Sequence, residues 1–282
     1  MTTRRRHKKT GRKGSVSPHL PVITLLTDFG TQDYFVGAVK GVIATHNPQA
    51  HVIDITHDIP PHDIDAAAFT LLACYQTFPK GTVHLAVVDP GVGSSRRAII
   101  VSAGTYLFVG PDNGIFSYIY ETVSAFKVYQ ITNEYYFRLP VSSTFHGRDI
   151  FAPVAAALSD GVRPSSFGCE INDPTRLRPL TISDNGGELV EGRVIHIDRF
   201  GNCITNLTRQ NLRPGDEKTS SLLINDQRIT TFQDHFSVKE GRKKQLFAIW
   251  GSAGFLEIAA KNRSAAKILG ARCGQPVRLR RK

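Results

Sequence analysis

The sequence lacks any long apolar run. No stretch of the 282-residue chain approaches the roughly 20 consecutive apolar residues that a membrane-spanning helix needs. The first residues also lack the apolar core of a signal peptide, since they are basic and no acidic residue precedes Asp28. These absences predict a soluble, cytoplasmic protein that makes no membrane contact.

Cysteine is sparse. The four cysteines (Cys74, Cys169, Cys203 and Cys273) are widely separated and form no CxxC pair. This spacing argues against a disulfide framework and against a structural zinc site. We expect all four to be small buried apolar side chains.

No acidic residue precedes Asp28, and charge is distributed unevenly along the chain. Residues 1–13 carry seven Lys and Arg side chains and residues 278–282 carry four, which together account for the whole net charge of +11. Such tails can contact nucleic acid or anionic membranes. The body has no basic stripe with interleaved aromatic residues, so nucleic-acid binding through the tails is only a secondary hypothesis. We expect solvated, disordered ends, with residues 1–20 as a basic leader.

The first part of the chain alternates strand-like and helical patterns. Apolar runs predict strands at Val22–Thr27, Val52–Thr56, Thr82–Val88 and Ala98–Ala103. Helical spacing of apolar residues predicts helices over 34–45 and 63–75. This alternation is typical of an α/β fold with a mostly parallel central sheet covered on both faces. We expect this N-terminal domain to span residues 21–182.

The residue composition changes around residues 176–187. This segment is polar and glycine-rich, as is typical of a domain boundary. Short strands are predicted beyond it at Leu189–Ile197, Cys203–Leu207, Ser221–Ile224, Arg228–Phe232, Leu246–Trp250 and Phe255–Ala259. Asn225-Asp226 is a hairpin-type turn signal between two of these strands. We expect a small β-barrel or sandwich domain over residues 188–282.

Asp28 follows the first predicted strand directly. Ligands of open α/β sheets bind beyond the carboxyl ends of the strands, where a carboxylate can accept two hydrogen bonds from a ribose diol. A helix-capping or turn aspartate is the equal alternative.

The loop of residues 87–97 carries Asp89 and Arg96, seven positions apart. It is similar to a dinucleotide-binding fingerprint, but Arg96 occupies the place of the third glycine and Pro90 interrupts the pattern. No helical pattern follows either. The loop is therefore a poor match for a phosphate-binding loop. Its Asp89 carboxylate and Arg96 guanidinium, held across a tight turn, belong either to a functional site or to a structural ion pair.

Two further segments carry polar groups. His146 precedes Gly147 at the start of an apparent helix, where it could exchange protons or be structural. The turn from Asp198 to Asn202 offers a carboxylate and a carboxamide that could hold an amino-acid zwitterion. A β-turn that uses these residues for geometry alone is the competing interpretation.

A mixed His and Asp cluster raises the possibility of a metal-dependent hydrolase. Its members are Asp54, His57, Asp58, His62, Asp63 and Asp65. Pro60-Pro61 within the cluster indicates an irregular turn, and no HExxH-like helical pair is present. We therefore expect no metal site.

The order of six segments is more informative than any one of them. The segments are Thr27-Asp28-Phe29-Gly30, Val88-Asp89-Pro90-Gly91-Val92-Gly93, Gly110-Pro111-Asp112-Asn113-Gly114, Phe145-His146-Gly147-Arg148-Asp149, Asp198-Arg199-Phe200-Gly201-Asn202 and Gly254-Phe255-Leu256-Glu257-Ile258. In this order they resemble the S-adenosylmethionine hydroxide adenosyltransferases, relatives of the S-adenosylmethionine-dependent fluorinase and chlorinase. The resemblance runs from about Val22 to Leu279.

The resemblance implies an N-terminal α/β domain, a C-terminal β-barrel, and a homotrimer whose active sites lie between neighbouring subunits. It implies hydrolysis of S-adenosyl-L-methionine to adenosine and L-methionine without a cofactor. The implied residue roles are as follows: Asp28 binds the ribose hydroxyls; Asp89, Arg96 and His146 surround the attacking water; Asp198, Asn202 and Ser252 contact the methionine part; and Asn262 contacts adenine.

The halogenases of this superfamily lack the Asp-Arg-His set, so its presence favours water over halide as the nucleophile. The sequence departs from the halogenases at Ala253, where they have an arginine. We expect in-line attack on C5′ from about 3 Å by water or hydroxide. In this hypothesis Arg96 stabilises hydroxide, His146 accepts the proton and Asp89 orients the pair. A halogenase on the same scaffold is the alternative.

Overall fold

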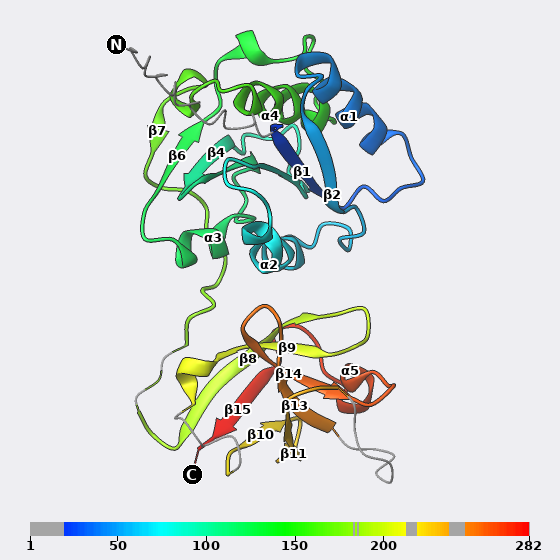
Figure 1. Cartoon of the computed structure of the whole chain (residues 1–282), viewed down its shortest axis with the longest axis vertical. Helices are drawn as coiled ribbons and strands as arrows, with labels where there is room; N and C mark the ends of the chain where they lie inside the picture. The colour runs from blue at the N-terminus through cyan, green and yellow to red at the C-terminus, as the bar shows by residue number, and fades with distance from the viewer. Residues whose placement is uncertain (1–19, 183, 185, 213–218, 237–245, 282) are drawn as a thin grey trace, which may run out of the picture.

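The chain folds into two parts, each built on its own β-sheet (Figure 1). The computed structural model describes residues 20–182, 184, 186–212, 219–236 and 246–281. The predicted leader therefore lies outside the described residues, except for Leu20. Every strand of the first sheet ends before residue 182 and every strand of the second begins after residue 188.

The first sheet has seven strands in the order β2-β1-β3-β5-β4-β6-β7. The strands are β1 (Val22–Thr27), β2 (His51–Thr56), β3 (Val83–Val87), β4 (Ala98–Ala103), β5 (Tyr106–Pro111), β6 (Phe126–Gln130) and β7 (Glu170–Ile171). Strands β2, β1, β3 and β5 are parallel, whereas β4 and β6 pair only antiparallel and β7 joins β6 antiparallel. The α/β class is confirmed. The prediction of a mostly parallel sheet holds for one half only, because β4 and β5 form a hairpin.

Helices cover both faces of this sheet, as predicted. The helices of the first part are α1 (Phe35–His46), α2 (Ile64–Cys74), α3 (Ser117–Thr122) and α4 (Ala152–Ser159). One core joins α1 and α4 to one face, and a second core joins α2 and α3 to the other. Figure 1 shows the resulting three layers. Asp63 caps α2 by accepting a hydrogen bond from the Ala66 amide, so the predicted helix start was one residue early.

Short helical segments complete the connections. They are η1 (Tyr75–Thr77), η2 (Glu134–Tyr136), the π-helix η3 (Gly147–Phe151), η4 (Pro164–Ser166) and η5 (Arg209–Asn211). Segment η3 runs directly into α4, so the helix predicted after His146 begins as a π-helical turn. Such turns are frequent at functional sites.

Within the described residues, the second sheet has eight strands in the order β11-β10-β15-β8-β9-β14-β13-β12. Its elements are β8 (Leu189–Ile197), β9 (Cys203–Thr208), β10 (Ser221–Ile224), β11 (Gln227–Ile229), β12 (Phe232–Gln233), β13 (Leu246–Trp250), β14 (Phe255–Ala260), α5 (Ala265–Leu269) and β15 (Pro276–Arg280). The sheet curls so that β11, at one edge, lies against β13, next to the other edge. This curled half-barrel encloses its own apolar core, in agreement with the predicted small β-barrel.

The predicted hairpin between two of these strands is confirmed. Strands β10 and β11 pair antiparallel, with Ile224 opposite Gln227. The two turn residues, Asn225 and Asp226, have φ values of 44° and 60°. Asparagine and aspartate tolerate this left-handed conformation better than other side chains, which explains why the turn was readable from sequence.

The expectation of a disordered C-terminal tail was wrong. Strand β15 lies between β10 and β8, and its Val277 and Leu279 are buried in the core. Arg281 is also buried; it pairs with Asp184 and donates to the Asn211 carbonyl. Alternation of arginine with apolar residues here marks a strand with one exposed face.

The cysteine prediction was correct in part. All four cysteines are free thiols, and Cys203 is buried. Cys169 and Cys273 are exposed because they lie in irregular segments rather than within strands. Within the described ranges, the helices are all too short or too polar to cross a membrane.

The two parts meet through an apolar contact. Phe69 of α2 stacks on the His196 ring of β8, with ring centroids 4.7 Å apart. Ile195 and Ile204 from the second sheet and Tyr118 of α3 belong to the same buried cluster. The helices α2 and α3 therefore pack on the first sheet with one face and on the second part with the other.

Candidate functional site

Two predicted aspartates lie at the carboxyl ends of neighbouring strands. Strands β1 and β3 pair in parallel, with Thr27 opposite Val87. Asp28 follows Thr27 directly, and Asp89 comes two residues after Val87. The sheet register therefore brings both carboxylates to one edge, where open α/β sheets bind their ligands.

Asp89 and Arg96 form a two-pronged ion pair. Arg96 Nε lies 2.9 Å from Asp89 Oδ1, and Arg96 Nη2 lies 2.5 Å from Asp89 Oδ2. The Asp89 and Arg96 side chains are only 5% and 11% exposed. The guanidinium also lies over the Phe151 ring, 5.2 Å from its centroid. Bidentate contact and burial together fix the guanidinium plane.

His146 joins this pair. Its Nδ1 lies 2.8 Å from Arg96 Nη2. A guanidinium can only donate hydrogen bonds, so Nδ1 is the acceptor and the neutral ring carries its proton on Nε2. Burial and then the nearby Arg96 charge lower the pKa of His146, against an opposing effect of Asp89. The imidazole is therefore neutral at neutral pH.

The loop that carries His146 is held by a buried carboxylate. Asp149 accepts hydrogen bonds from Arg148 Nε at 2.7 Å, Arg138 Nη1 at 3.1 Å and the Ser142 amide at 2.9 Å. Burial alone would raise the pKa of Asp149, but these three donors outweigh it and lower the pKa. Asp149 thus ties Arg138 and the Ser142 backbone to η3, the segment that begins directly after His146.

A close backbone approach joins this loop to the Asp89 loop. Gly93 has a φ of 78°, and a Cβ there would collide with the Ser143 carbonyl. Only glycine permits this conformation and this approach together. The contact holds Arg96 and His146 on facing loops at hydrogen-bonding distance.

A cavity of about 290 Å³ opens beside these groups. Its lining includes Asp28, Asp89 and His146, together with the rings of Phe29, Phe35 and Phe145. Asp28 Oδ2 accepts a hydrogen bond of 2.9 Å from the His62 amide, and His62 has a φ of 68°. We call this space the N-terminal cavity.

The predicted methionine-side and adenine-side residues line a second cavity of about 780 Å³, which we call the C-terminal cavity. Asp198, Asn202, Ser252 and Asn262 all border it. Asp198 Oδ1 accepts from the Phe200 and Asn202 amides at 2.9 and 2.8 Å, and Asp198 Oδ2 accepts from Asn202 Nδ2 at 2.8 Å. These bonds hold the carboxylate and the carboxamide side by side on the β8–β9 turn.

Glu257 also lines this cavity, although its sequence context did not single it out as a site residue. Burial and then the nearby Asp198 charge raise the pKa of Glu257. Two carboxylates that face one cavity favour a cationic ligand group. Glu257 lies within the matched segment Gly254 to Ile258, so its strand was recognised but its inward direction was not.

The two cavities share no lining residue in the described part of one chain. The structure brings Asp28, Asp89, Arg96 and His146 together on the first part. It brings Asp198, Asn202, Ser252 and Asn262 together on the second part. The predicted site residues therefore form two clusters rather than one.

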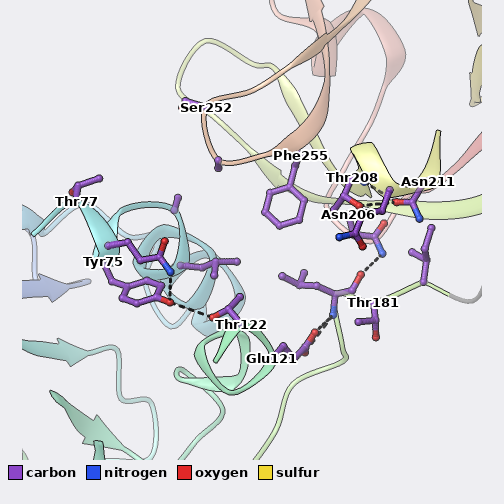
Figure 2. Close-up of a pocket in the computed structure, with 17 residues that line it drawn as sticks. Tyr75, Thr77, Glu121, Thr122, Thr181, Asn206, Thr208, Asn211, Ser252 and Phe255 are labelled. Atoms are coloured by element: carbon purple, nitrogen blue, oxygen red, sulfur yellow. Dashed lines mark hydrogen bonds between the residues drawn. The ribbon is translucent and has the colours of Figure 1, made fainter. Parts of the chain in front are cut away.

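A third hollow, of about 650 Å³, lies between the two parts and is shown in Figure 2. Ser252 is the predicted site residue at its border. Polar groups that line the hollow hold Leu180, which lies in the segment that connects the two parts. Glu121 Oε2 accepts a hydrogen bond from the Leu180 amide at 3.0 Å, and Asn206 Nδ2 donates to the Leu180 carbonyl at 2.9 Å. This hollow is part of the joint between the domains.

The His and Asp cluster considered for a metal is divided among other partners. Asp54 contacts Lys40 and His57, Asp63 caps α2, and Asp65 accepts from Tyr118 Oη. In the part of the chain that the structure describes, no group of three His, Cys, Asp or Glu side chains is arranged to hold a metal ion.

The chain is similar to known proteins over most of its length. Residues 23–168 match the family model of the SAM hydroxide adenosyltransferase N-terminal domain, and residues 192–278 match that of the C-terminal domain. The (R)-S-adenosyl-L-methionine hydrolase of Thermus thermophilus is 38% identical over 265 residues, covering 91% of this chain and 98% of that protein. The hydrolase of the same name from Methanocaldococcus jannaschii is 36% identical over 264 residues, covering 89% and 92%.

A crystal structure of an uncharacterized conserved protein from Thermotoga maritima superposes with a TM-score of 0.83 at 33% identity. It covers 92% of this chain and 100% of the other. The fluorinase of Actinoplanes sp. is more distant, at 25% identity over 221 residues, covering 68% of this chain and 73% of the fluorinase.

Proposed function

Because the chain belongs to the SAM hydroxide adenosyltransferase family, we propose that it hydrolyses S-adenosyl-L-methionine to adenosine and L-methionine. The observation that carries this proposal is the Asp89–Arg96–His146 set beside the N-terminal cavity. Arg96 offers a fixed positive charge and His146 a neutral imidazole. Asp28, the carboxylate suited to bind ribose, lines the same cavity.

The reaction requires no cofactor. A hydroxide oxygen forms a bond to C5′ while the C5′–S bond breaks, and the electron pair of that bond passes to sulfur. The sulfonium becomes the neutral thioether of methionine, so its positive charge and the hydroxide's negative charge cancel. The enzyme has to hold the oxygen in line with the leaving group, at about 3 Å from C5′.

Arg96 and His146 would stabilise the attacking oxygen. Arg96 carries a fixed charge that favours hydroxide over water, because the opposite charges attract in a partly buried site. With Nδ1 engaged by Arg96, the Nε2–H group of His146 can donate a hydrogen bond to the hydroxide oxygen and keep its proton. The role of proton acceptor predicted from sequence would instead require Arg96 to leave Nδ1 first.

The remaining roles divide between the two cavities. Asp28 would accept hydrogen bonds from the ribose hydroxyls, and Asn262 would contact adenine. Asp198 and Glu257 would attract the methionine ammonium, while Asn202 and Ser252 would hold the carboxylate. Since the residues for the ribose and the attacking water line one cavity, and those for methionine and adenine line the other, we propose that the N-terminal cavity of one subunit meets the C-terminal cavity of the next in a homotrimer.

The deciding experiment is incubation of the purified protein with S-adenosyl-L-methionine, with and without chloride, followed by chromatography of the nucleosides. Adenosine and methionine in equal amounts, independent of chloride, are expected. Chloride-dependent 5′-chloro-5′-deoxyadenosine would overturn the hydrolase in favour of the halogenase alternative. The tail-based nucleic-acid hypothesis concerns mainly residues 1–19, outside the described residues, and a cytoplasmic location stays a prediction.

A further inference from the structure

A buried histidine outside the reacting groups contacts the strand end that carries Asp28. His57 follows β2, and its side chain is 5% exposed. Its Nδ1 lies 2.8 Å from Oγ1 of Thr27, the residue before Asp28. Thr27 is itself buried, so neither group is solvated by bulk water.

The directions of the hydrogen bonds around Thr27 follow from its neighbours. Thr27 Oγ1 accepts a hydrogen bond of 3.3 Å from the Phe29 amide. Its hydroxyl proton is then free to point to His57 Nδ1, which places the ring proton on Nε2. The His57 ring thus terminates a short chain that begins at the backbone immediately after Asp28.

The other side of the His57 ring faces an ion pair. Nε2 lies 3.1 Å from Asp54 Oδ1, a close electrostatic contact that lacks the alignment of a well-formed hydrogen bond. Asp54 Oδ2 in turn lies 2.7 Å from Lys40 Nζ. Partial burial opposes ionisation of Asp54, but Lys40 and His57 outweigh it and lower the pKa of Asp54. The carboxylate therefore stays charged and holds the ring orientation.

The backbone reinforces this link. The Gly30 amide donates to the His57 carbonyl at 2.8 Å, and the Ile59 amide donates to the Thr27 carbonyl at 3.4 Å. The His62 amide reaches Asp28 Oδ2 at 2.9 Å. The segments after β1 and β2 therefore form one unit, in which the His57 ring is the buried side-chain link.

We propose that His57 is a positioning residue that acts through Thr27 to hold the Asp28 carboxylate in the orientation that binds the ribose diol. This inference rests on the proposed function, because it assigns the ribose to Asp28. His57 contacts no reacting atom; it determines where the carboxylate points. Loss of the ring should weaken recognition of the ribose hydroxyls and leave the water-activating set intact.

The variants His57→Phe and Thr27→Val each remove one end of the contact while keeping similar volume. The chain offers a matched control on the same strand: Thr24 Oγ1 lies 2.8 Å from Nδ1 of the buried His84. His84→Phe and Thr24→Val remove an equivalent buried Thr–His contact away from the site. Any loss of binding or stability that the site variants share with the control variants is due to removing a buried Thr–His contact in general, and not to the position of Asp28.

The first measurement is the dissociation constant of 2′-deoxyadenosine divided by that of adenosine, which is large when the ribose 2′-hydroxyl is recognised. In His57→Phe and Thr27→Val we expect this ratio to shrink by about tenfold, the equivalent of one charged hydrogen bond. The KM for S-adenosyl-L-methionine should rise by a similar factor with kcat within about threefold of wild type, because a binding contact is lost. The double variant should be no worse than either single one, since both act on one contact.

A second measurement needs no ligand. Hydrogen exchange at the Phe29 and Gly30 amides should accelerate in His57→Phe and Thr27→Val but not in the two control variants. Unchanged exchange together with an unchanged adenosine ratio would overturn the inference. Faster exchange in a protein that neither binds adenosine nor cleaves S-adenosyl-L-methionine would instead reject the proposed function and leave the positioning of Asp28 standing.

Discussion

Among single residues, His146 is distinguished by the position of its proton. Its Nδ1 accepts from Arg96, so its Nε2 can donate to the nucleophile. A glutamine can reproduce both contacts, with an amide oxygen toward Arg96 and an amide nitrogen toward water. We therefore predict that His146→Gln keeps kcat within about tenfold of wild type, whereas His146→Ala loses about 100-fold or more, as for loss of one transition-state donor.

Adenosine formation at saturating substrate measures both values. Circular dichroism should show that both variants remain folded. A glutamine variant as inactive as the alanine variant would mean that the imidazole has to accept a proton, as first predicted from the sequence.

His84 predicts a pH dependence of stability. It is fully buried beside Thr24, and burial lowers its pKa to about 3. An unfolded histidine has a pKa of about 6.5, so between these values the unfolded chain binds more protons than the folded chain. The free energy of unfolding should therefore be insensitive to this group above pH 6.5. It should fall by up to about 1.4 kcal/mol per pH unit as the pH decreases from 6.5 toward 3.

Urea unfolding at several pH values, with His84→Gln as the comparison, measures this contribution. The difference between the two proteins should change over the window from pH 6.5 to 3. Parallel curves throughout that window would show that His84 does not titrate with the expected shift.

At the scale of elements, the contact between two loops controls the site. Gly93→Ala would place a Cβ against the Ser143 carbonyl at a φ of 78° and push the two loops apart. We predict a loss of activity of at least about tenfold, because small displacements of positioned groups have large effects on rate. The expected cost in stability is about 1–3 kcal/mol.

Gly104→Ala is the matched control. Gly104 also has a positive φ, 59°, but nothing lies within 4 Å of the added Cβ. Gly104→Ala should lower the free energy of unfolding through backbone strain but leave the enzymatic activity unchanged. Equal activity losses in the two variants would argue against a role for the Gly93–Ser143 approach.

Much of the secondary structure could be predicted from the sequence. The predicted ranges of β1, β4, β8, β10 and β13 agree with the structure. Strand β15 was taken for a charged tail because arginines alternate with its two buried residues. Strand β7, with two residues, is too short to leave a periodic pattern.

The residues of the candidate site were recognised through the order of their segments. Periodicity and local composition left Asp28 and His146 undecided, since a turn aspartate or a structural histidine has the same local sequence. The proton position on His146 could not be predicted, because it depends on an approach between residues 96 and 146 across two loops. Glu257 was missed for a related reason: its inward direction follows from the curl of the second sheet.

At the scale of the whole molecule, the separate cavities predict that activity requires two chains. A mixture of His146→Ala and Asp198→Asn subunits should regain activity, because some interfaces combine the intact cavity of each. If equal amounts of the two variants assemble at random into closed trimers, about a quarter of all interfaces combine an intact N-terminal cavity with an intact C-terminal cavity. Each variant alone should be inactive.

Co-expression with two different affinity tags, followed by purification through both, isolates the mixed assemblies. Their adenosine formation should exceed that of either parent variant. Mixed assemblies without activity would place both halves of each site within one chain. Sequence patterns within one chain carry no physical signal for such sharing, so only the family resemblance predicted it.

The place of β15 in its sheet has a consequence for biosynthesis. The first sheet has all seven strands once residue 171 has been made, so this domain can fold while the rest of the chain is still being translated. The second sheet needs residues 276–280 between β10 and β8 before its core can close. Early termination would therefore leave a folded first domain attached to an incomplete sheet whose unpaired edges can aggregate.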